Sequence, residues 1–528
     1  PLSGPPPEPG YVLVIDQTRG DASIPGALAD AESFKAMLEA ARAENPSQRI
    51  VVKLHPDVIA GRKHGHFGSS DAAGDVELWP DQTNPWELIE GAHSVYTVSS
   101  QMGYEAILAG KPVRCFGAGF YSGWGLTEDE VSTPRRTATH TPETLFHACH
   151  LDCPIYFDPW HQRLCSFEDA VDILSVFLDH ERQTQDSRSE VFGGVRLWKR
   201  RNLARFRPRL DRPPKFADDA PTAKAIAEQQ NRRLWLWASH ASEDDPTGTG
   251  YVEDGFLRSV GLGAKLTQAA SLVFDRAGIY YDPSRPSDLE RLIESAAKGA
   301  ADEARAERLI AKIVSLGLSK YNTGLPLELD LPEGRRVILV PGQVEDDASI
   351  LRGTGEVKTN FALLSAVREA NPDAFLIYKP HPDVEAGLRT GKVPESDLEA
   401  MADLVVRNAA PAELIEHADE IWTMTSLMGF EALLRGKSVT CLGTPFYAGW
   451  GLTEDLGPSS PRRAARPSLA QLAWATLIAY PTYVDPVSGL PCTPELIVER
   501  LATGQSFPKA TTLSRMQSLF ANQSWLWR

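Results

Sequence analysis

The sequence predicts an α/β protein in which helices cover parallel sheets and one type of domain occurs twice. Short β-rich runs alternate with amphipathic helical runs, which is the rhythm of parallel α/β folds. Motifs from the first part of the chain return near its end, so part of the chain is duplicated. The length of 528 residues allows about three to four domains, which is more than the duplicated pair alone.

The elements expected in the first copy follow one another in order. Residues 11–15 form an apolar, β-rich strand. Residues 29–43 form a helix, because apolar side chains such as Phe34 and Met37 recur at helical spacing. Asn84-Pro85-Trp86 opens another helix, since proline fits the first helical turn. The remaining elements are strands at 50–53, 95–98 and 113–116, and a helix at 102–108.

The repeat has a constant offset over most of its length. Gln-x-x-x-Asp at Gln17 and Asp21 returns 326 positions later at Gln343 and Asp347. Past Asp129 the offset becomes 327, and it then holds to the end of the repeat. A single shift over such a distance indicates two copies of one domain rather than a solenoid. The other repeated motifs are Lys-x-His-Pro, Met-Gly-x-Glu-Ala, Phe-Tyr-x-Gly-Trp-Gly and Pro-Arg-Arg.

A different α/β segment separates the two copies. It is expected to contain strands at 234–238 and 271–274 and a long helix from Ser287 towards Leu316. Paired with the second copy, it would form a two-domain enzyme with a cleft between unlike Rossmann-type halves. The first copy would then lack its N-terminal half, and the absent initiator Met hints at the same. The predicted domains are 1–180, a basic linker at 181–215, the middle half at 216–330, and 331–528.

Composition and charge exclude several classes of protein. The net charge of −16 argues against nucleic acid as a partner. Six cysteines are too few for a disulfide scaffold, which favours a reducing cytoplasm. No run of 18 apolar residues and no signal-peptide pattern occurs. Nine Lys and Arg residues between Arg196 and Lys215 suit an anionic membrane surface or, alternatively, a solvated linker.

The Lys-x-His-Pro motif provides the first candidate binding residues. It ends a strand in each copy, at Lys53 and His55 and again at Lys379 and His381. Ligands of open parallel sheets bind at the carboxyl ends of strands. A cation beside an imidazole at that edge suits a phosphate or a carboxylate. The alternative is a histidine that only caps a neighbouring backbone group.

The next candidates lie between a strand and a helix. The hydroxyl residues there are able to cap the helix or to hold an anion at its N-terminus. A glutamate follows within about one turn, where its carboxylate is able to accept hydrogen bonds from ribose hydroxyls. The residues are Ser99, Ser100 and Glu105 in the first copy and Thr425, Ser426 and Glu431 in the second.

Carboxylates supply the candidate catalytic groups. Asp21 and Asp347 follow the first strand of each copy, where an aspartate is able to act as a nucleophile or as a turn residue. Glu253-Asp254 precedes a glycine turn in the middle segment. Across a cleft from Asp347, this pair would complete a two-carboxylate site of the kind glycosyl transfer requires.

Two further motifs have less definite roles. The aromatic Phe-Tyr-x-Gly-Trp-Gly loop would either pack in the core or line a sugar site. The group His147, Cys149, His150, Cys153 and Cys165 superficially suggests zinc, but the second copy does not reproduce it. No metal is therefore expected, and Lys, His and a helix dipole would hold an anionic leaving group.

Together these motifs are similar to those of the KpsC/LipA family of bacterial capsule polysaccharide proteins, which build a β-Kdo linker. The resemblance runs from Tyr11 to about Asp485 and includes Glu-Asp-Gly-Phe-Leu-Arg-Ser-Val-Gly and Gly-Ile-Tyr-Tyr-Asp. It implies modules of two Rossmann-like halves in a GT-B-like arrangement. It also implies retaining transfer of Kdo from CMP-β-Kdo to a Kdo-terminated, phosphatidylglycerol-linked acceptor at the inner face of the cytoplasmic membrane.

The resemblance also assigns roles to residues. Asp347 would be the nucleophile and Glu253 the acid/base, with Asp21 the equivalent of Asp347 in the first copy. Gln343, Lys379, His381, Thr425, Ser426 and Glu431 would bind the donor, as would Lys53, His55, Ser99, Ser100 and Glu105. No cofactor is implied, and capsule assembly proteins are further expected partners. The alternatives are a non-catalytic export or scaffold protein that binds glycolipid, and a transferase that uses another nucleotide sugar.

Overall fold

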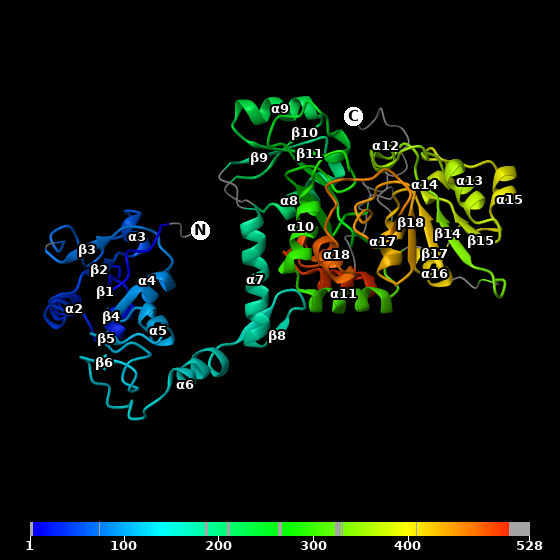
Figure 1. Ribbon diagram of the computed structural model, residues 1–528. Helices are drawn as coiled ribbons and strands as arrows, with labels where there is room; N and C mark the ends of the chain where they lie inside the picture. The colour runs from blue at the N-terminus through cyan, green and yellow to red at the C-terminus, as the bar shows by residue number, and fades with distance from the viewer. Residues whose placement is uncertain are drawn as a thin grey trace. The chain divides into compact units, whose positions relative to one another are not determined.

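The computed structural model describes residues 4–72, 74–184, 188–208, 212–261, 267–320, 322, 329, 331–407 and 409–505 (Figure 1). The chain divides into two compact units. The first comprises Pro1–Tyr156 and Leu164–Phe167, and the second comprises Phe157–Arg163 and Glu168–Arg528. Within the described ranges no helix is long and apolar enough to cross a membrane.

The first unit is built on a six-stranded sheet in which every paired strand is parallel. The strand order is β3-β2-β1-β4-β5-β6. The strands are β1 (Tyr11–Ile15), β2 (Ile50–Lys53), β3 (Val76–Trp79), β4 (Ala92–Thr97), β5 (Val113–Cys115) and β6 (Glu128–Asp129). The helices are α1 (Ser23–Gly26), α2 (Ala31–Glu44), α3 (Pro56–Ile59), α4 (Pro85–Gly91), α5 (Gln101–Leu108) and α6 (Pro142–His147).

Alternate residues of β1 pack into two different cores. Leu13 lies in a cluster with Leu88 of α4, and Val12 lies in another with Phe34 of α2. Helices therefore cover both faces of the sheet, which confirms the predicted parallel α/β class. The helix predicted at 29–43 begins two residues later, because the side chain of Asp30 caps it and accepts from the backbone N–H of Glu32.

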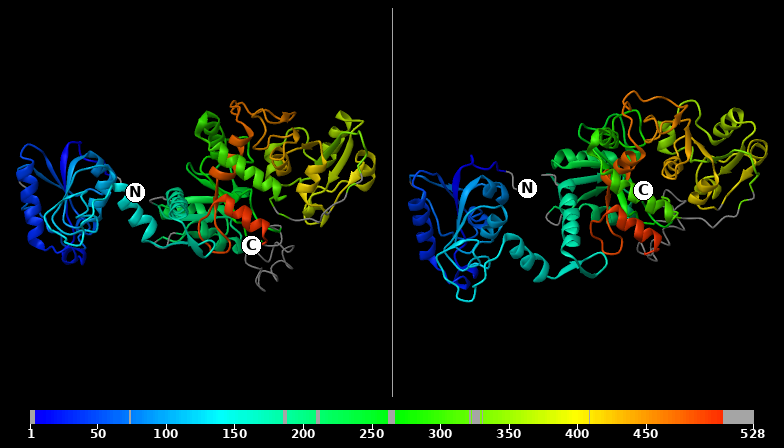
Figure 2. Two further views of the ribbon diagram at one scale, coloured as in Figure 1. Left: turned by 90° about the horizontal axis from the view of Figure 1, so that it is seen from below. Right: turned by 60° about the horizontal axis from the view of Figure 1, so that its bottom comes forward.

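The second copy forms an equivalent sheet in the second unit, with the order β16-β15-β14-β17-β18-β19 (Figures 1 and 2). The same order in both copies confirms the duplication that the repeat predicted. The strands are β14 (Val337–Pro341), β15 (Phe375–Lys379), β16 (Leu404–Val405), β17 (Glu420–Thr423), β18 (Ser438–Cys441) and β19 (Glu454–Asp455). The helices are α12 (Ala348–Gly353), α13 (Asn360–Ala370), α14 (Pro382–Glu385), α15 (Glu395–Met401), α16 (Pro411–His417) and α17 (Leu427–Leu433).

The middle half has its own sheet, with the order β10-β9-β11-β12-β13-β20. Its strands β9 to β12 are parallel, and β13 is antiparallel to both of its neighbours. The strands are β9 (Glu190–Gly193), β10 (Lys215–Ala217), β11 (Arg233–Trp237), β12 (Gly250–Asp254), β13 (Ser271–Asp275) and β20 (Pro481–Tyr483). The helices are α8 (Leu197–Phe206), α9 (Ala220–Gln229), α10 (Asp288–Ser295) and α11 (Glu303–Ser315).

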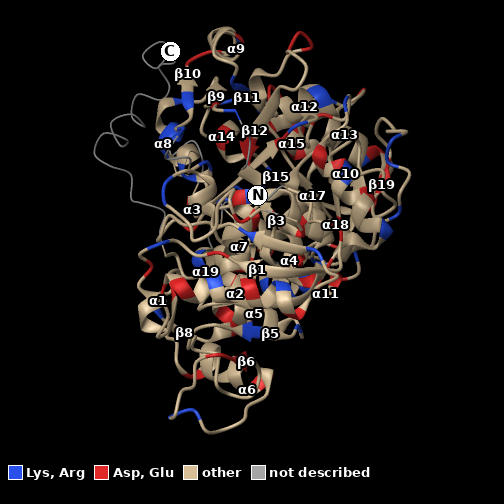
Figure 3. Cartoon of the chain, turned by 90° about the vertical axis from the view of Figure 1, so that its left-hand side faces the viewer, with Lys and Arg blue, Asp and Glu red and all other residues tan. Residues whose placement is uncertain are grey.

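The stretch 181–215 is not a linker, contrary to the prediction. It contains β9, which pairs with both β10 and β11 inside the middle sheet. It also contains α8, which buries Leu203 and Phe206. Lys and Arg residues occur along α8 (Figure 3). In the sequence they obscure the apolar residues that pack this helix, which is why the charge run resembles a solvated linker.

The predicted boundary after residue 330 also fails to separate the middle half from everything that follows it. After the second copy the chain returns, and β20 adds to the middle sheet beside β13. α18 (Leu469–Ala473) and α19 (Pro494–Ala502) contact α11 there. The long helix expected after Ser287 is interrupted between α10 and α11, where Gly299 adopts a φ of +96°.

Helix α7 (Phe167–Thr184) belongs from Glu168 onward to the second unit rather than to the first copy. The offset of 327 aligns it with α19. Val498 and Leu501 of α19 are buried, whereas their counterparts Val171 and Leu174 are 43% and 58% exposed. The two copies therefore differ in what covers this helix.

Two arginines of the Pro-Arg-Arg motif join the two halves of the second unit. Arg462 and Arg463 each donate to the buried Glu290 of α10, with Nε–O distances of 3.0 Å. Arg463 also donates to the carbonyl oxygens of Pro445 and Ala448. These two arginines are therefore not solvated, because a carboxylate of the other half pairs with both.

We expect Glu290→Gln to lower the free energy of unfolding by about 3 kcal/mol, because two guanidinium groups would lose the anion that compensates their burial. Urea unfolding measures the change. Glu294→Gln, on the same helix, is the matched control, and equal midpoints for the two variants would contradict this role for Glu290.

Candidate functional site

A cleft of about 1300 Å³ lies between the middle half and the second copy. One wall is the edge where β14, β15 and β17 end, and the other is formed by β12 and the loop after β13. The structure brings together every site residue predicted for these two halves. They are Glu253, Gln343, Asp347, Lys379, His381, Thr425, Ser426 and Glu431.

Gln343 fixes the architecture of this edge. Its amide nitrogen donates to Thr425 Oγ1 at 2.9 Å, and its amide oxygen accepts from the Thr425 backbone N–H at 3.0 Å. The same oxygen also accepts from Thr423 Oγ1. Gln343 therefore connects the end of β14 to the turn after β17. These bonds occupy most of the hydrogen-bonding capacity of its amide group, which the sequence assigns to binding of the donor substrate.

Lys379 and His381 supply the cationic and donor groups of the same wall. Lys379 ends β15 and is only 6% exposed, and burial lowers the pKa of its amine. His381 Nδ1 accepts from the backbone N–H of Asp383 at 3.2 Å, so the neutral ring carries its proton on Nε2. Burial lowers the pKa of His381, which keeps the ring neutral near pH 7. The pair can therefore bind an anion through a charge and a neutral N–H.

Ser426 and Glu431 lie on α17. Ser426 Oγ accepts from the Met428 backbone N–H, so the serine caps the helix, as the simpler of its two predicted roles requires. Glu431 is 7% exposed, and its Oε1 accepts from the Lys320 backbone N–H at 2.9 Å. Burial raises the pKa of Glu431. One carboxylate oxygen therefore already holds the segment that connects the two halves.

Asp347 has an exposed side chain at the start of α12. Its Oδ2 accepts from Ser349 Oγ at 2.8 Å and from the Ser349 backbone N–H at 3.3 Å, which caps α12. The capping role and a chemical role are compatible, because a carboxylate has lone pairs left for a substrate.

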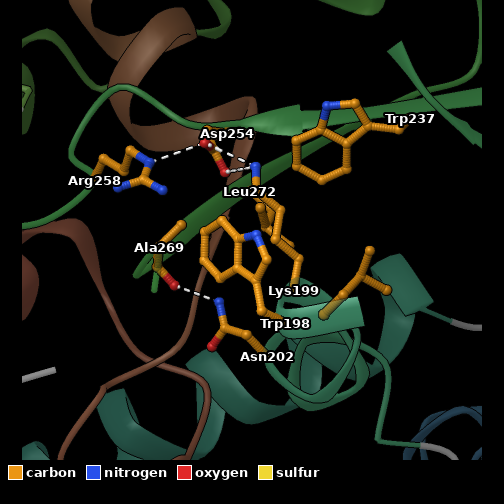
Figure 4. Close-up of a pocket in the computed structure, with 9 residues that line it drawn as sticks. Trp198, Lys199, Asn202, Trp237, Asp254, Arg258, Ala269 and Leu272 are labelled. Atoms are coloured by element: carbon orange, nitrogen blue, oxygen red, sulfur yellow. Dashed lines mark hydrogen bonds and ion pairs between the residues drawn. The ribbon is translucent and has the colours of Figure 1, made fainter. Parts of the chain in front are cut away.

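Glu253 lines the cleft at the end of β12. Its neighbour Asp254 belongs to a charge cluster with Lys199 and Arg258 (Figure 4). The Lys199 amine lies 3.1 and 3.2 Å from the two oxygens of Asp254 and 3.7 Å from the Trp237 ring centre. Arg258 Nε donates to the same carboxylate at 2.9 Å. Burial alone would raise the pKa of Asp254, but these two cations outweigh it and hold that pKa below its usual range.

The neighbouring carboxyl behaves in the opposite way. Burial raises the pKa of Glu253 to about 7, although Lys199 lowers it in part. The pKa values of two adjacent carboxyls are thus shifted in opposite directions, which is the environment of an acid or base that works near neutral pH.

Lys199, Tyr281 and Lys320 were not among the site residues that the sequence predicts. Lys199 was read as part of the linker, and its partner Asp254 lies 55 positions further along the chain. Tyr281 belongs to the Gly-Ile-Tyr-Tyr-Asp motif, which was noted without a role, and it lines the cleft together with Lys320. The periodicity of α8 was the only signal that could have shown that Lys199 is part of a packed domain.

The first unit repeats the local arrangement of the strand ends. Gln17 Nε2 donates to Ser99 Oγ at 3.1 Å, and His55 Nδ1 accepts from the Asp57 backbone N–H at 3.1 Å. Lys53 is buried, and burial lowers the pKa of its amine. The other predicted residues take equivalent places: Asp21 accepts from Ser23, Ser100 caps α5, and burial raises the pKa of Glu105.

The aromatic loop packs mainly in the core. Tyr447 and Trp450 are 0% and 1% exposed, and Trp450 Nε1 donates to the Phe446 carbonyl. Phe446 itself reaches the cleft and packs against Phe256, with ring centroids 4.9 Å apart and the ring planes tilted by 51°. Across the described ranges, no group of three or more His, Cys, Asp or Glu side chains is placed to hold a metal ion.

Two Rossmann-like halves that face each other across a cleft define the GT-B class of glycosyltransferases, which confirms the expected fold class. A family model described as "Capsule polysaccharide biosynthesis protein" matches residues 5–153 and 249–483. The chain belongs to this family.

The relatives agree with this assignment. The capsule polysaccharide modification protein LipA of Neisseria meningitidis serogroup B is 41% identical over 498 residues, which cover 91% of this chain and 70% of LipA. The lipopolysaccharide-processing protein LpsZ of Rhizobium meliloti is 47% identical over 238 residues, 44% of this chain and 53% of LpsZ.

Solved structures are similar as well. The β-Kdo 2,4-transferase of Thermosulfurimonas dismutans KpsC has a TM-score of 0.50 and 31% identity, covering 60% of this chain and 99% of that chain. The β-Kdo 2,7-transferase of the same KpsC has a TM-score of 0.49 and 35% identity, covering 60% and 100%.

Proposed function

We propose that the chain is a retaining glycosyltransferase that moves Kdo from CMP-β-Kdo to a Kdo-terminated, phosphatidylglycerol-linked acceptor during capsule synthesis. The similarity to a Kdo transferase at 31% identity supports the sugar. The observation that carries the proposal is the pairing in one cleft of an exposed carboxylate, Asp347, with a carboxyl of raised pKa, Glu253.

Retention follows from two displacements at one carbon. In the first, a carboxylate oxygen of Asp347 bonds to the anomeric carbon and the bond to the phosphate oxygen breaks, so CMP leaves with that electron pair. In the second, Glu253 takes the proton of the acceptor hydroxyl, whose oxygen bonds to the anomeric carbon and displaces Asp347. Each displacement inverts the carbon, and the product keeps the original configuration.

The leaving phosphate would be held by Lys379 and by Nε2–H of His381. A cation and a neutral donor at the strand ends stabilise the charge that develops on this oxygen. We therefore propose that transfer needs no metal, and we expect activity to persist after dialysis against EDTA.

Release of CMP tests the proposed function. Wild-type protein mixed with CMP-Kdo and a Kdo-terminated acceptor should release CMP and extend the acceptor by one residue. A protein that only exports or scaffolds glycolipid would release none. The buried and paired acidic and basic groups of the cleft favour the enzyme over that alternative.

The choice of nucleotide has a separate test. CMP should raise the unfolding temperature of the wild type more than UDP does at equal concentration. The reverse order would favour a transferase with another nucleotide-sugar donor.

We expect Lys379→Met to raise KM for CMP-Kdo by about 10- to 100-fold, because a buried cation that faces the phosphate would be lost. Calorimetric titration with CMP gives the matching change in affinity. Lys392→Met removes an exposed lysine of the same half and serves as control. Unchanged CMP affinity in Lys379→Met would rule out this contact.

We further propose that the protein works at the inner face of the cytoplasmic membrane, next to capsule assembly proteins. The exposed Leu197, with Arg201 nearby on α8, suits an anionic lipid surface. The structure leaves fewer basic side chains of this segment available to contact lipid than the sequence suggests, because Lys199 pairs with Asp254 and Arg207 packs over Phe274.

A further inference from the structure

Tyr281 has a hydroxyl group that no described residue of the chain pairs with. The residue follows β13 in the Gly-Ile-Tyr-Tyr-Asp motif and lines the cleft. Its hydroxyl oxygen is shielded from solvent and has no hydrogen-bond partner among the residues described. Buried polar groups are nearly always paired, so an orphan in a cleft wall indicates a partner that arrives with the substrate.

The backbone around Tyr281 is held against α12, the helix that Asp347 caps. Asp282, the next residue, is buried and forms an ion pair with Arg352 of α12. Arg352 Nη2 also donates to the Ala241 carbonyl at 3.0 Å. α12 begins directly after Asp347, so one short helix holds the nucleophile at one end and the Tyr281 segment near the other.

The environment keeps this hydroxyl protonated. Burial raises the pKa of Tyr281 well above its usual value, and the charges of Glu253 and Asp347 raise it further. The ring is steadied by an edge contact with Tyr280, with centroids 5.3 Å apart. A neutral O–H donor therefore lies within the electrostatic reach of both catalytic carboxyls but is bound to neither.

We propose that Tyr281 is a catalytic residue whose hydroxyl donates a hydrogen bond to the carboxylate on the reacting carbon of the transferred sugar. The inference rests on the proposed function. A 2-keto-acid sugar carries its carboxylate on the anomeric carbon, so attack by Asp347 brings two anions together. A neutral donor at this point offsets that repulsion without pairing with the nucleophile, and it remains protonated throughout both displacements.

Tyr281→Phe tests the proposal in the full chain. We expect kcat for CMP release from CMP-Kdo to fall by about 10- to 100-fold, with KM raised by no more than about tenfold. The unfolding temperature should not fall, because no protein bond is removed. Tyr104→Phe serves as the control, because it removes another buried hydroxyl without a partner among the described residues. Phenylalanine already occupies the equivalent position in the second copy. A wild-type kcat in Tyr281→Phe would overturn the inference.

A binding measurement separates this inference from the proposed function. In the presence of CMP, free Kdo should bind Tyr281→Phe about tenfold more weakly than it binds the wild type. Equal affinities would overturn the role of Tyr281 even if the enzyme is active. If the wild type releases no CMP from CMP-Kdo, the proposed function fails, and a loss of Kdo affinity in the variant would still support the contact.

Discussion

Asp347→Asn should abolish sugar transfer, lowering kcat by at least about 10³-fold, while the protein keeps its fold and its affinity for CMP. The amide has nearly the shape of the carboxylate, and its oxygen can still accept from Ser349, so α12 keeps its cap. It cannot bond to the anomeric carbon as an anion. Asp347→Ala should be equally inactive and slightly less stable. CMP release under single-turnover conditions measures the loss.

Asp21→Asn is the matched variant in the first unit. Asp21 accepts from the Ser23 backbone N–H at 2.9 Å, as Asp347 does from Ser349, so the same local change is made. Transfer that survives Asp347→Asn but is lost in Asp21→Asn would contradict the assignment of the reaction to the second copy. Full activity in both Asp347 variants would remove that aspartate from the mechanism altogether.

The sequence was sufficient to predict the two duplicated sheets. Their strands are short apolar runs, their helices carry apolar residues at helical spacing, and Pro85 marks where one helix begins. These signals are local, so they are legible in the chain itself. The repeat shows each of these signals twice. It therefore predicts that the strand-end motifs lie at the equivalent edge of each of the two sheets.

The contacts within the site were harder to predict from the sequence, because they join distant parts of the chain. Nothing local distinguishes Gln343, which holds the turn at Thr425, from a glutamine that binds a ligand. Glu431 fits a ribose contact by position, yet one of its oxygens is used by Lys320, 111 residues earlier. Sequence spacing identifies which residues reach an edge, but it does not reveal which of them are already bonded to one another.

The same limitation explains why the sequence predicts a linker at 181–215. A run of cations is usually solvated, and the compensating groups of this one lie elsewhere. Arg207 is 4% exposed and lies over Phe274, while Lys199 lies between Asp254 and Trp237. The basic segment thus includes Lys199, which lowers the pKa of both Glu253 and Asp254 at the cleft.

The electrostatic role of Lys199 leads to the prediction with the second largest effect. Glu253 must be ionised to take the proton of the acceptor hydroxyl, so kcat should rise with pH through its pKa of about 7. Glu253→Gln should lower kcat by about 10²- to 10⁴-fold and remove this acidic limb. A limb that persists in Glu253→Gln would mean that another group titrates.

Lys199→Met should move the same limb to higher pH. The Lys199 ammonium group favours the ionised form of Glu253, so removing it raises the pKa of Glu253. The negative charge of Asp254 also raises this pKa, and without Lys199 it is no longer offset. A shift of about one pH unit would reduce kcat about fivefold at pH 7 and hardly at all at pH 9. Lys224→Met breaks another ion pair of the middle half, with Asp245 at 2.7 Å, and should leave the profile in place. An unchanged limb in Lys199→Met, or an equal shift in Lys224→Met, would show that the cluster beneath Glu253 supports the fold without tuning the base.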